Sequence, residues 1–154
     1  MEQWKITYNK WDRHKQPLRE ALLTLGNGYF ATRAAFEWTS AGDPHYPGTY
    51  LAGGYNRLKS EVADRTIENE DLVNLPNWLY LNFRTEGGDW LNIDSVELLE
   101  FEQQLDVHEG ILTEFIRFKD AGGRITSLTA RRIVHMANPH LAGIQWQLTP
   151  ENWS

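Results

Sequence analysis

Leu-Gly-Asn-Gly-Tyr-Phe-Ala-Thr-Arg, at residues 25–33, is the stretch around which the rest of the chain is organised. Asn27 and Gly28 give a strong signal for a tight turn, because both residue types tolerate a positive φ. The residues that follow, 29–36, predict a strand in which alanines stand among aromatic side chains. Small residues in a strand let another backbone or a ligand approach closely. By itself, the stretch is therefore a turn followed by a closely packed strand.

The composition excludes several classes of protein. The chain has 154 residues, which fits one domain large enough to bury its own core. It contains no cysteine, so it has neither disulfides nor thiolate metal sites, and a cytoplasmic location is expected. We find no apolar run that resembles a signal peptide or a membrane span. The net charge is −6 and the basic residues are scattered, which argues against nucleic acid as a partner.

The pattern of apolar residues predicts an all-β fold with one short helix after Pro17. The region 57–71 is charged and shows no apolar periodicity, so we expect an exposed loop there. A shift in the pattern near Ser127 and Leu128 predicts a β-bulge. Strands separated by turns at this spacing are typical of an antiparallel β-sandwich. Strands are expected at residues 1–11, 29–36, 48–55, 79–84, 90–93, 95–105, 111–119, 124–136 and 144–148.

Six motifs, in order, carry a resemblance that covers nearly the whole chain. They are Gly26-Asn27-Gly28-Tyr29 with Arg33 and Glu37, residues 47–53 (Pro-Gly-Thr-Tyr-Leu-Ala-Gly), residues 70–78 (Glu-Asp-Leu-Val-Asn-Leu-Pro-Asn-Trp), Leu105-Asp106 with Gly110, Arg131-Arg132, and residues 149–154 (Thr-Pro-Glu-Asn-Trp-Ser). Together they resemble the N-terminal domain of glycoside hydrolase family 65, which holds maltose, trehalose and kojibiose phosphorylases and some trehalases. The chain departs from the family at residues 30–32, where members commonly have Leu-Gly-Val, and residues 58–69 match no family motif.

The resemblance implies an antiparallel β-sandwich (supersandwich type) that precedes an (α/α)6 barrel. It also implies inverting phosphorolysis of α-glucosyl disaccharides, with a glutamate acid and a phosphate site that both lie in the barrel. We therefore assign residues 1–154 to one N-terminal domain, expect it to lack further strands at its C-terminal end, and assign no catalytic residue to it. The implied partners are the barrel and, in the parent enzyme, a glucosyl disaccharide and phosphate, with no cofactor. A homodimer is left open.

The candidate binding residues are aromatic side chains in predicted loops or beside glycines, because aromatic rings stack on the apolar faces of sugars. These are Tyr46, Tyr50, Tyr55 and Trp78, although packing at a sheet edge is an alternative role for Trp78. By the resemblance, Tyr29, Arg33 and Glu37 are candidates for an interface with the barrel. An Arg33–Glu37 contact within the chain is the more ordinary use of that pair.

Other chemistry is less well supported by the sequence. Glu68, Glu70 and Asp71 form the densest acidic cluster, and a solvated face is the default interpretation for them. His135 and His140 lack a third ligand at a useful spacing, so no metal site is predicted, and His135 is expected to be a partly buried, hydrogen-bonded strand residue. His14, His45 and His108 are interpreted as surface residues. Three functions remain open: a non-catalytic module of a disaccharide phosphorylase, an independent carbohydrate-binding domain, and a fragment without autonomous function.

Overall fold

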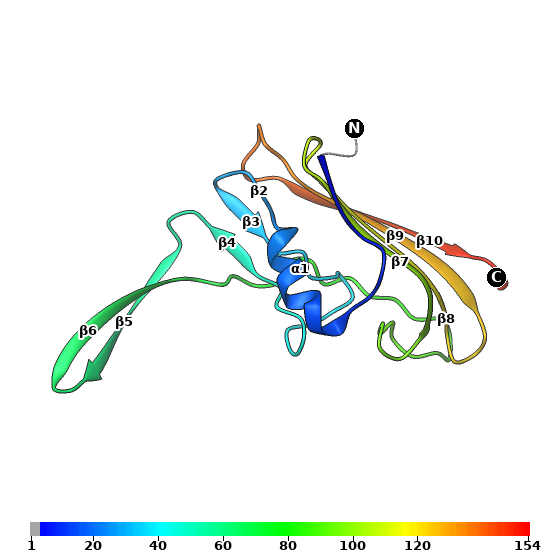
Figure 1. Cartoon of the computed structure of the whole chain (residues 1–154), viewed down its shortest axis with the longest axis horizontal. Helices are drawn as coiled ribbons and strands as arrows, with labels where there is room; N and C mark the ends of the chain where they lie inside the picture. Colours follow the sequence, from blue (N-terminus) through cyan, green and yellow to red (C-terminus); the bar gives the residue numbers. More distant parts are fainter. Residues whose placement is uncertain (1–3) are drawn as a thin grey trace.

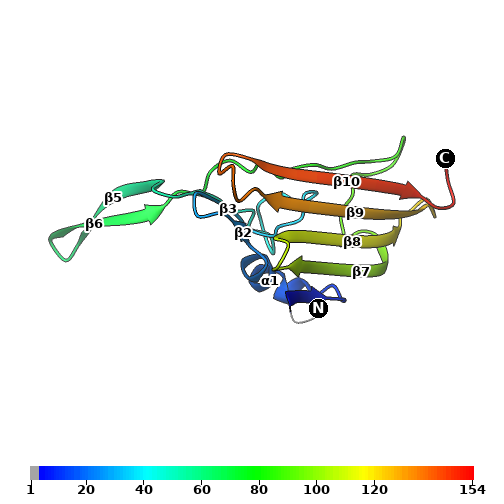
Figure 2. The ribbon, with the colours of Figure 1, turned by 90° about the horizontal axis from the view of Figure 1, so that it is seen from above.

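A five-stranded antiparallel sheet forms the body of the molecule. The computed structural model describes residues 4–154, and the sheet has the order β1-β7-β8-β9-β10 (Figures 1 and 2). Gly110 and Gly123 stand in its hairpin turns with φ values of 66° and 82°, a conformation that favours glycine. The strands are β1 (Lys5–Tyr8), β7 (Glu97–Asp106), β8 (Ile111–Lys119), β9 (Ile125–Val134) and β10 (Ala142–Pro150).

One face of this sheet is buried, because alternate residues of β8 and β9 point toward the interior and most of them are apolar. Leu112, Ile116 and Leu128 on that face are fully or almost fully buried. They pack against Leu23, which follows helix α1 (Gln16–Leu22), and against the coil that contains Phe36 and Trp38. A 3-10 turn at Arg13–Lys15 precedes the helix. The Asp12 side chain accepts hydrogen bonds from the backbone amides of His14 and Lys15, which fixes where the helical segment begins. The short helix predicted after Pro17 is confirmed.

A small sheet of β2 (Leu25–Gly26), β3 (Phe30–Thr32) and β4 (Thr49–Leu51) lies next to the body. The predicted turn is present between β2 and β3, where the Asn27 side chain accepts hydrogen bonds from the amides of Tyr29 and Phe30. The strand expected over 29–36 ends at Thr32, however. Beyond it the carbonyls of Arg33 and Ala35 accept hydrogen bonds from the Arg132 side chain instead of from a neighbouring strand.

A second hairpin, β5 (Tyr55–Val62) and β6 (Arg65–Leu72), projects away from the body (Figures 1 and 2). The exposed loop expected over 57–71 is therefore wrong in its secondary structure, although nearly all of its residues are exposed. The two strands were missed because charged residues occupy one face of the hairpin and both faces are exposed. The sequence therefore lacks the alternation of apolar and polar residues that marks a half-buried strand. We call residues 55–72 the arm.

Three further predictions fail for identifiable reasons. Residues 79–84 and 90–93 are coil, in which the Asn82 side chain donates to the carbonyls of Trp38 and Leu91 in place of a strand ladder. β9 pairs without a register shift on both sides, and the irregularity lies in β7 between Leu98 and Glu100. The expected strand over residues 1–11 is confined to β1, and residues 1–3 lie outside the described part of the chain.

The all-β, antiparallel fold class is confirmed. The buried face of the large sheet is covered by coil, α1 and the short strands, so a complete second sheet of a sandwich stays a prediction. No helix among residues 4–154 is long and apolar enough to span a membrane.

Candidate functional site

Arg33 contacts Tyr46 and lies beside Gly48, where the hydroxyl group of Tyr50 is also found. Its guanidinium donates to the carbonyls of Tyr46 and Pro17, each at 3.0 Å, and lies 5.2 Å from the centre of the Tyr46 ring. Gly48 permits this arrangement, because a Cβ atom there would lie 2.5 Å from the Tyr50 hydroxyl and 2.6 Å from Arg33 Cδ. Burial raises the pKa of Tyr50, and a hydrogen bond with Tyr46 raises it further.

Tyr29 and Trp78, which are far apart in sequence, line one apolar hollow of about 430 Å³. Tyr29 packs edge-on against His140 with ring centres 4.6 Å apart, and Trp78 packs against Phe30 at 5.8 Å. The Trp78 indole also donates to Thr32 Oγ1 at 3.3 Å. Trp78 thus packs on β3, which matches the alternative role considered for it.

Tyr50 and Tyr55 line a second, smaller hollow of about 220 Å³ beside the first. The two hollows share Tyr29, Phe30 and Leu51, so they form one continuous surface around β3 and β4. Four of the predicted residues therefore meet here. We call this the aromatic surface, made of Tyr29, Phe30, Tyr50, Leu51, Tyr55 and Trp78.

Glu37 lies in the interior, and its partner is Arg132 of β9 rather than Arg33. Both side chains are almost completely buried, and the guanidinium lies 2.5 Å from Glu37 Oε1. The Arg33–Glu37 contact considered from the sequence is therefore not formed. Because Arg132 also binds the carbonyls of Arg33 and Ala35, it fixes the path of the chain behind the aromatic surface.

Glu114 is the second acidic residue of this buried cluster. Its Oε1 accepts a hydrogen bond from Gln103 at 2.8 Å, and its Oε2 lies 3.6 Å from Arg132. Burial raises the pKa of Glu114 well above its ordinary value, the neighbouring Glu37 raises it further, and Arg132 opposes the shift. One cation thus faces two buried carboxyl groups, and Glu114 is the group that burial favours in its neutral form.

His45 is only partly exposed, with 9% of its side chain accessible to solvent, so its interpretation as a surface residue is wrong. Its Nδ1 lies 2.8 Å from the fully buried carboxyl group of Glu20, whose other oxygen accepts from the Tyr46 amide. No local pattern could reveal this contact, because the two residues are 25 positions apart. His14 and His108 are exposed, as expected. His135 accepts hydrogen bonds from the amides of Ala137 and Asn138, also as expected, but it is exposed rather than partly buried.

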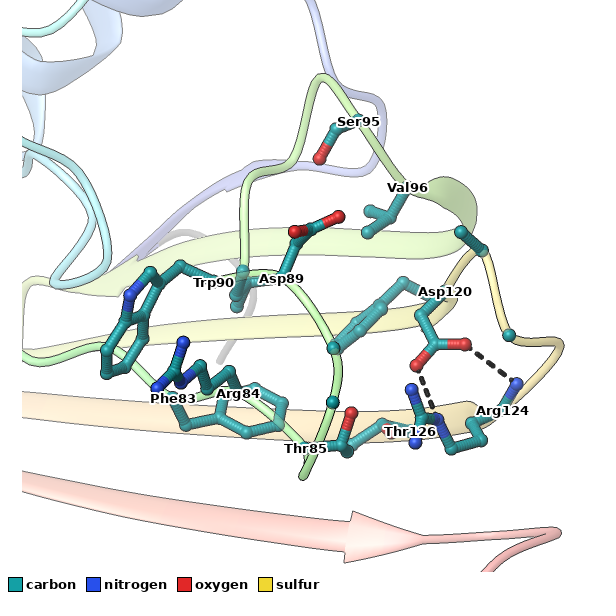
Figure 3. Close-up of a pocket in the computed structure, with 16 residues that line it drawn as sticks. Phe83, Arg84, Thr85, Asp89, Trp90, Ser95, Val96, Asp120, Arg124 and Thr126 are labelled. Carbon is teal, nitrogen blue, oxygen red and sulfur yellow. Dashed lines mark hydrogen bonds and ion pairs between the residues drawn. The ribbon is translucent and has the colours of Figure 1, made fainter.

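A pocket of about 360 Å³ at the end of the large sheet was not anticipated (Figure 3). The coil at 83–91 forms one wall, and the turn between β8 and β9 forms the other. Trp90 is 56% exposed and the Arg84 guanidinium lies 5.0 Å from its ring, while Arg124 pairs with Asp120 at 2.7 Å. Trp90 was missed because residues 90–93 were interpreted as a strand.

Within residues 4–154 no group of three His, Cys, Asp or Glu side chains could hold a metal ion. The acidic cluster at 68–71 lies on the exposed arm, where Arg57 is 3.8 Å from Glu68 and 3.5 Å from Glu70. Roles for Tyr46, Tyr50, Tyr55 and Trp78 in sugar binding, and for Tyr29, Arg33 and Glu37 at a domain interface, stay predictions.

Comparison with known proteins identifies relatives of this domain. The model of the N-terminal domain of glycosyl hydrolase family 65 matches residues 6–154. An uncharacterized glycosyl hydrolase of Mycobacterium tuberculosis is 45% identical over 98% of this chain, which spans 11% of that protein. The kojibiose phosphorylase of Caldanaerobacter subterraneus subsp. tengcongensis is 34% identical over 97% of this chain, which spans 18% of it.

A solved structure has the same fold. A putative kojibiose phosphorylase from the human microbiome superposes with a TM-score of 0.86 at 21% identity, and the match covers 96% of this chain and 20% of that one. The chain therefore corresponds to between about a tenth and a fifth of the relatives that it matches.

Proposed function

Because the chain belongs to the N-terminal domain family of glycosyl hydrolase family 65, we propose that it is the non-catalytic N-terminal module of an enzyme acting on α-glucosyl disaccharides. In this proposal the module packs on the catalytic barrel and shapes the entrance to its active site. The observation that carries the proposal is the aromatic surface, in which residues from β3, β4 and the 78 region form two adjoining apolar hollows. Exposed apolar hollows of this kind mark sites of contact with another protein surface or a ligand.

The relatives support the class of substrate. Those that match over most of this chain are named kojibiose phosphorylase, trehalose 6-phosphate phosphorylase and maltose phosphorylase. Each is several times longer than this chain, which leaves room for a barrel that carries the general acid and the phosphate site. A cytoplasmic location is part of the proposal and fits a chain without cysteine.

An activity assay tests the non-catalytic role directly. The purified chain is incubated with phosphate and, in turn, kojibiose, trehalose and maltose, and glucose 1-phosphate release is measured. We expect no turnover, and phosphorolysis of any of the three sugars would overturn the proposal.

The packing role needs the longer polypeptide. In an enzyme that carries this module and a barrel, Arg33→Ala should release Tyr46 and loosen the aromatic surface, which would lower turnover or the melting temperature. Arg131→Ala is the matched control, because Arg131 is exposed on β9. Equal behaviour of the two variants would argue against a packing role for Arg33.

A second function, carbohydrate binding by the module itself, is favoured by the pocket in Figure 3. Sugar sites combine an exposed aromatic ring with charged hydrogen-bonding groups, and Trp90, Asp89 and Arg124 supply both. Titration with maltose, trehalose and glucose, followed by tryptophan fluorescence, tests this function. Binding that is lost in Trp90→Ala but kept in Trp4→Ala would support it, and no response at millimolar sugar would count against it.

A further inference from the structure

The arm is an isolated two-stranded sheet. β5 and β6 pair only with each other among the described residues, and the arm extends from the body by about 25 Å, the length of eight strand residues (Figure 1). Two strands alone are marginally stable in water. An arm of this kind is therefore expected to gain stability from a partner.

The two faces of the arm differ in character. Residues directly opposite in an antiparallel pair share a face, so Arg57, Lys59, Glu61, Glu68 and Glu70 all lie on one side. The other side carries three exposed aliphatic residues, Leu58, Val62 and Ile67, with Arg65 and Asp71 toward its two ends, while Tyr55 and Leu72 lie on the charged side. A strip of neighbouring aliphatic side chains on a sheet is normally covered by another element or chain.

The turn of the arm determines which backbone N–H and C=O groups of β5 point away from β6. Ala63 and Asp64 have φ values of 51° and 58°, which makes a two-residue type I′ hairpin between Val62 and Arg65. In such a turn the backbone of Val62 bonds to Arg65, and the direction alternates along the strand. The backbone groups of the odd-numbered residues 55–61 therefore point away from β6, toward an edge that is unpaired in residues 4–154.

The side chains along this free edge are complementary to themselves. If two copies of β5 pair antiparallel around a two-fold axis at Ser60, Lys59 lies opposite Glu61 of the second copy, and this pair occurs twice. In the same register Leu58 lies opposite Val62 of the second copy, also twice, on the apolar face. The charged pairs are the ones with outward backbone groups, so they also form the inter-strand hydrogen bonds. Lys59 and Glu61 have no ion-pair partner elsewhere in residues 4–154.

Other pairings place like charges together. Shifting the axis to Lys59 puts the two Lys59 side chains opposite each other, and shifting it to Glu61 does the same for the two glutamates. On the other edge of the arm, an axis at Asn69 would put Glu68 opposite Glu70 of the second copy. Like charges directly opposite destabilise a pair of strands. Of these axes, only the one at Ser60 pairs opposite charges on one face of β5 and aliphatic side chains on the other.

We propose that the arm is a homodimerisation element, in which β5 pairs with β5 of a second copy of this chain around Ser60. The result is a four-stranded sheet, β6-β5-β5-β6, with a continuous aliphatic strip on one face. A second copy is favoured over an unrelated partner because β5 is complementary to itself when it runs antiparallel. Around Ser60, Lys59 then faces Glu61 and Leu58 faces Val62. The eight residues of β5 are fewer than the roughly 20–30 residues that each partner contributes to a standard interface, so dimerisation of this chain alone depends on concentration.

Charge-reversal variants test the register in solution. Sedimentation equilibrium of the 154-residue chain should give a mass that rises with concentration from 17.9 kDa toward twice that value. Lys59→Glu and Glu61→Lys should each remain monomeric, because each places like charges opposite. The double variant Lys59→Glu/Glu61→Lys, and an equimolar mixture of the two single variants, should dimerise again. Glu70→Lys, which reverses a charge on the same face of β6, is the control and should dimerise at least as well as the unmodified chain.

A cysteine at the axis tests the geometry independently. The chain has no other cysteine, so Ser60→Cys introduces a single thiol whose counterpart in the dimer lies across a close, non-hydrogen-bonded pair. Mild oxidation should convert Ser60→Cys to a covalent dimer at least tenfold faster than Thr66→Cys, which lies on β6.

Three results would overturn the proposal. The first is a mass that stays at 17.9 kDa up to about 1 mM. The second is a dimer that persists in both single charge variants, which would place the contact on another surface, such as the edge of β10. The third is equal oxidation rates of the two cysteine variants, which would also fit an arm that is covered only by the barrel of a longer polypeptide.

Discussion

Arg132 is the residue on which the interior of this domain depends most. A buried guanidinium is stable only where charge and hydrogen-bond partners surround it, and here it meets Glu37, Glu114 and two backbone carbonyls. These partners come from β8 and from the coil after β3, so one side chain links the sheet to the segment that carries the aromatic surface. The neighbouring Arg131 points to the other face of β9 and has no such role.

Replacing Arg132 by methionine should therefore be severe. The variant leaves a buried carboxyl group without its cation, which typically costs about 3–5 kcal/mol. For a domain of this size, that corresponds to a fall in melting temperature of roughly 6–20 °C. Arg131→Met should change stability by no more than about 0.5 kcal/mol, as for other exposed positions. Calorimetry of both variants provides the comparison, and similar melting temperatures would show that the buried cluster contributes little.

Glu114 makes the stability of the fold depend on pH. Its pKa is raised in the folded state, so the folded protein retains a proton that the unfolded chain loses near 4.5. The stability linked to this group is fully present below that value and is lost as the pH rises toward the folded pKa. Glu114→Gln keeps the neutral form, so the stability of the variant relative to the parent should increase as the pH rises through neutrality. Urea denaturation between pH 4.5 and 8 measures the difference, and parallel pH profiles would contradict it.

At the scale of elements, the sequence predicts strands best where one face is buried and the other is not. β8 was predicted with its observed bounds, because Leu112, Ile116 and Phe118 alternate with half-buried residues. The arm was missed because its alternation separates charged from aliphatic residues with both faces exposed. The strand expected at 79–84 was wrong because Leu79 and Phe83 pack on the core from a coil.

The candidate site was partly predictable for a related reason. Tyr29, Tyr50, Tyr55 and Trp78 were found as aromatic residues near turns and glycines, which are local signals. The Glu37–Arg132 pair is separated by 95 positions, and Glu20–His45 by 25, so no local pattern could reveal them. Such pairs become visible only once the register of β8 and β9 and the path of the coil are known.

The turn of the arm gives a prediction at this scale. Ala63 has a φ of 51°, a region that costs a residue with a Cβ atom about 1 kcal/mol or more. Replacing Ala63-Asp64 by Asn-Gly supplies the residues that a type I′ turn prefers and should stabilise the hairpin by roughly 1 kcal/mol. Slower amide exchange at residues 56–71 would confirm the effect, while Gly110→Ala, at a turn with a φ of 66°, should have the opposite effect on β7 and β8. Unchanged exchange in the arm would show that the turn is not strained.

At the scale of the whole molecule, stability is divided unevenly between the body and the arm. The body has two buried clusters on one face of the large sheet, while the arm has no buried side chain. Hydrogen exchange of a dilute sample should therefore show amides of β8 and β9 that open only with global unfolding, and arm amides that exchange at least a thousandfold faster. Raising the concentration should slow exchange at the odd-numbered residues 57, 59 and 61, whose amides point outward, and leave β8 and β9 unchanged. Protection that increases in β10 instead would mean that copies associate through the edge of the large sheet, and protection of the arm in the dilute sample would mean that the hairpin is stable without a partner.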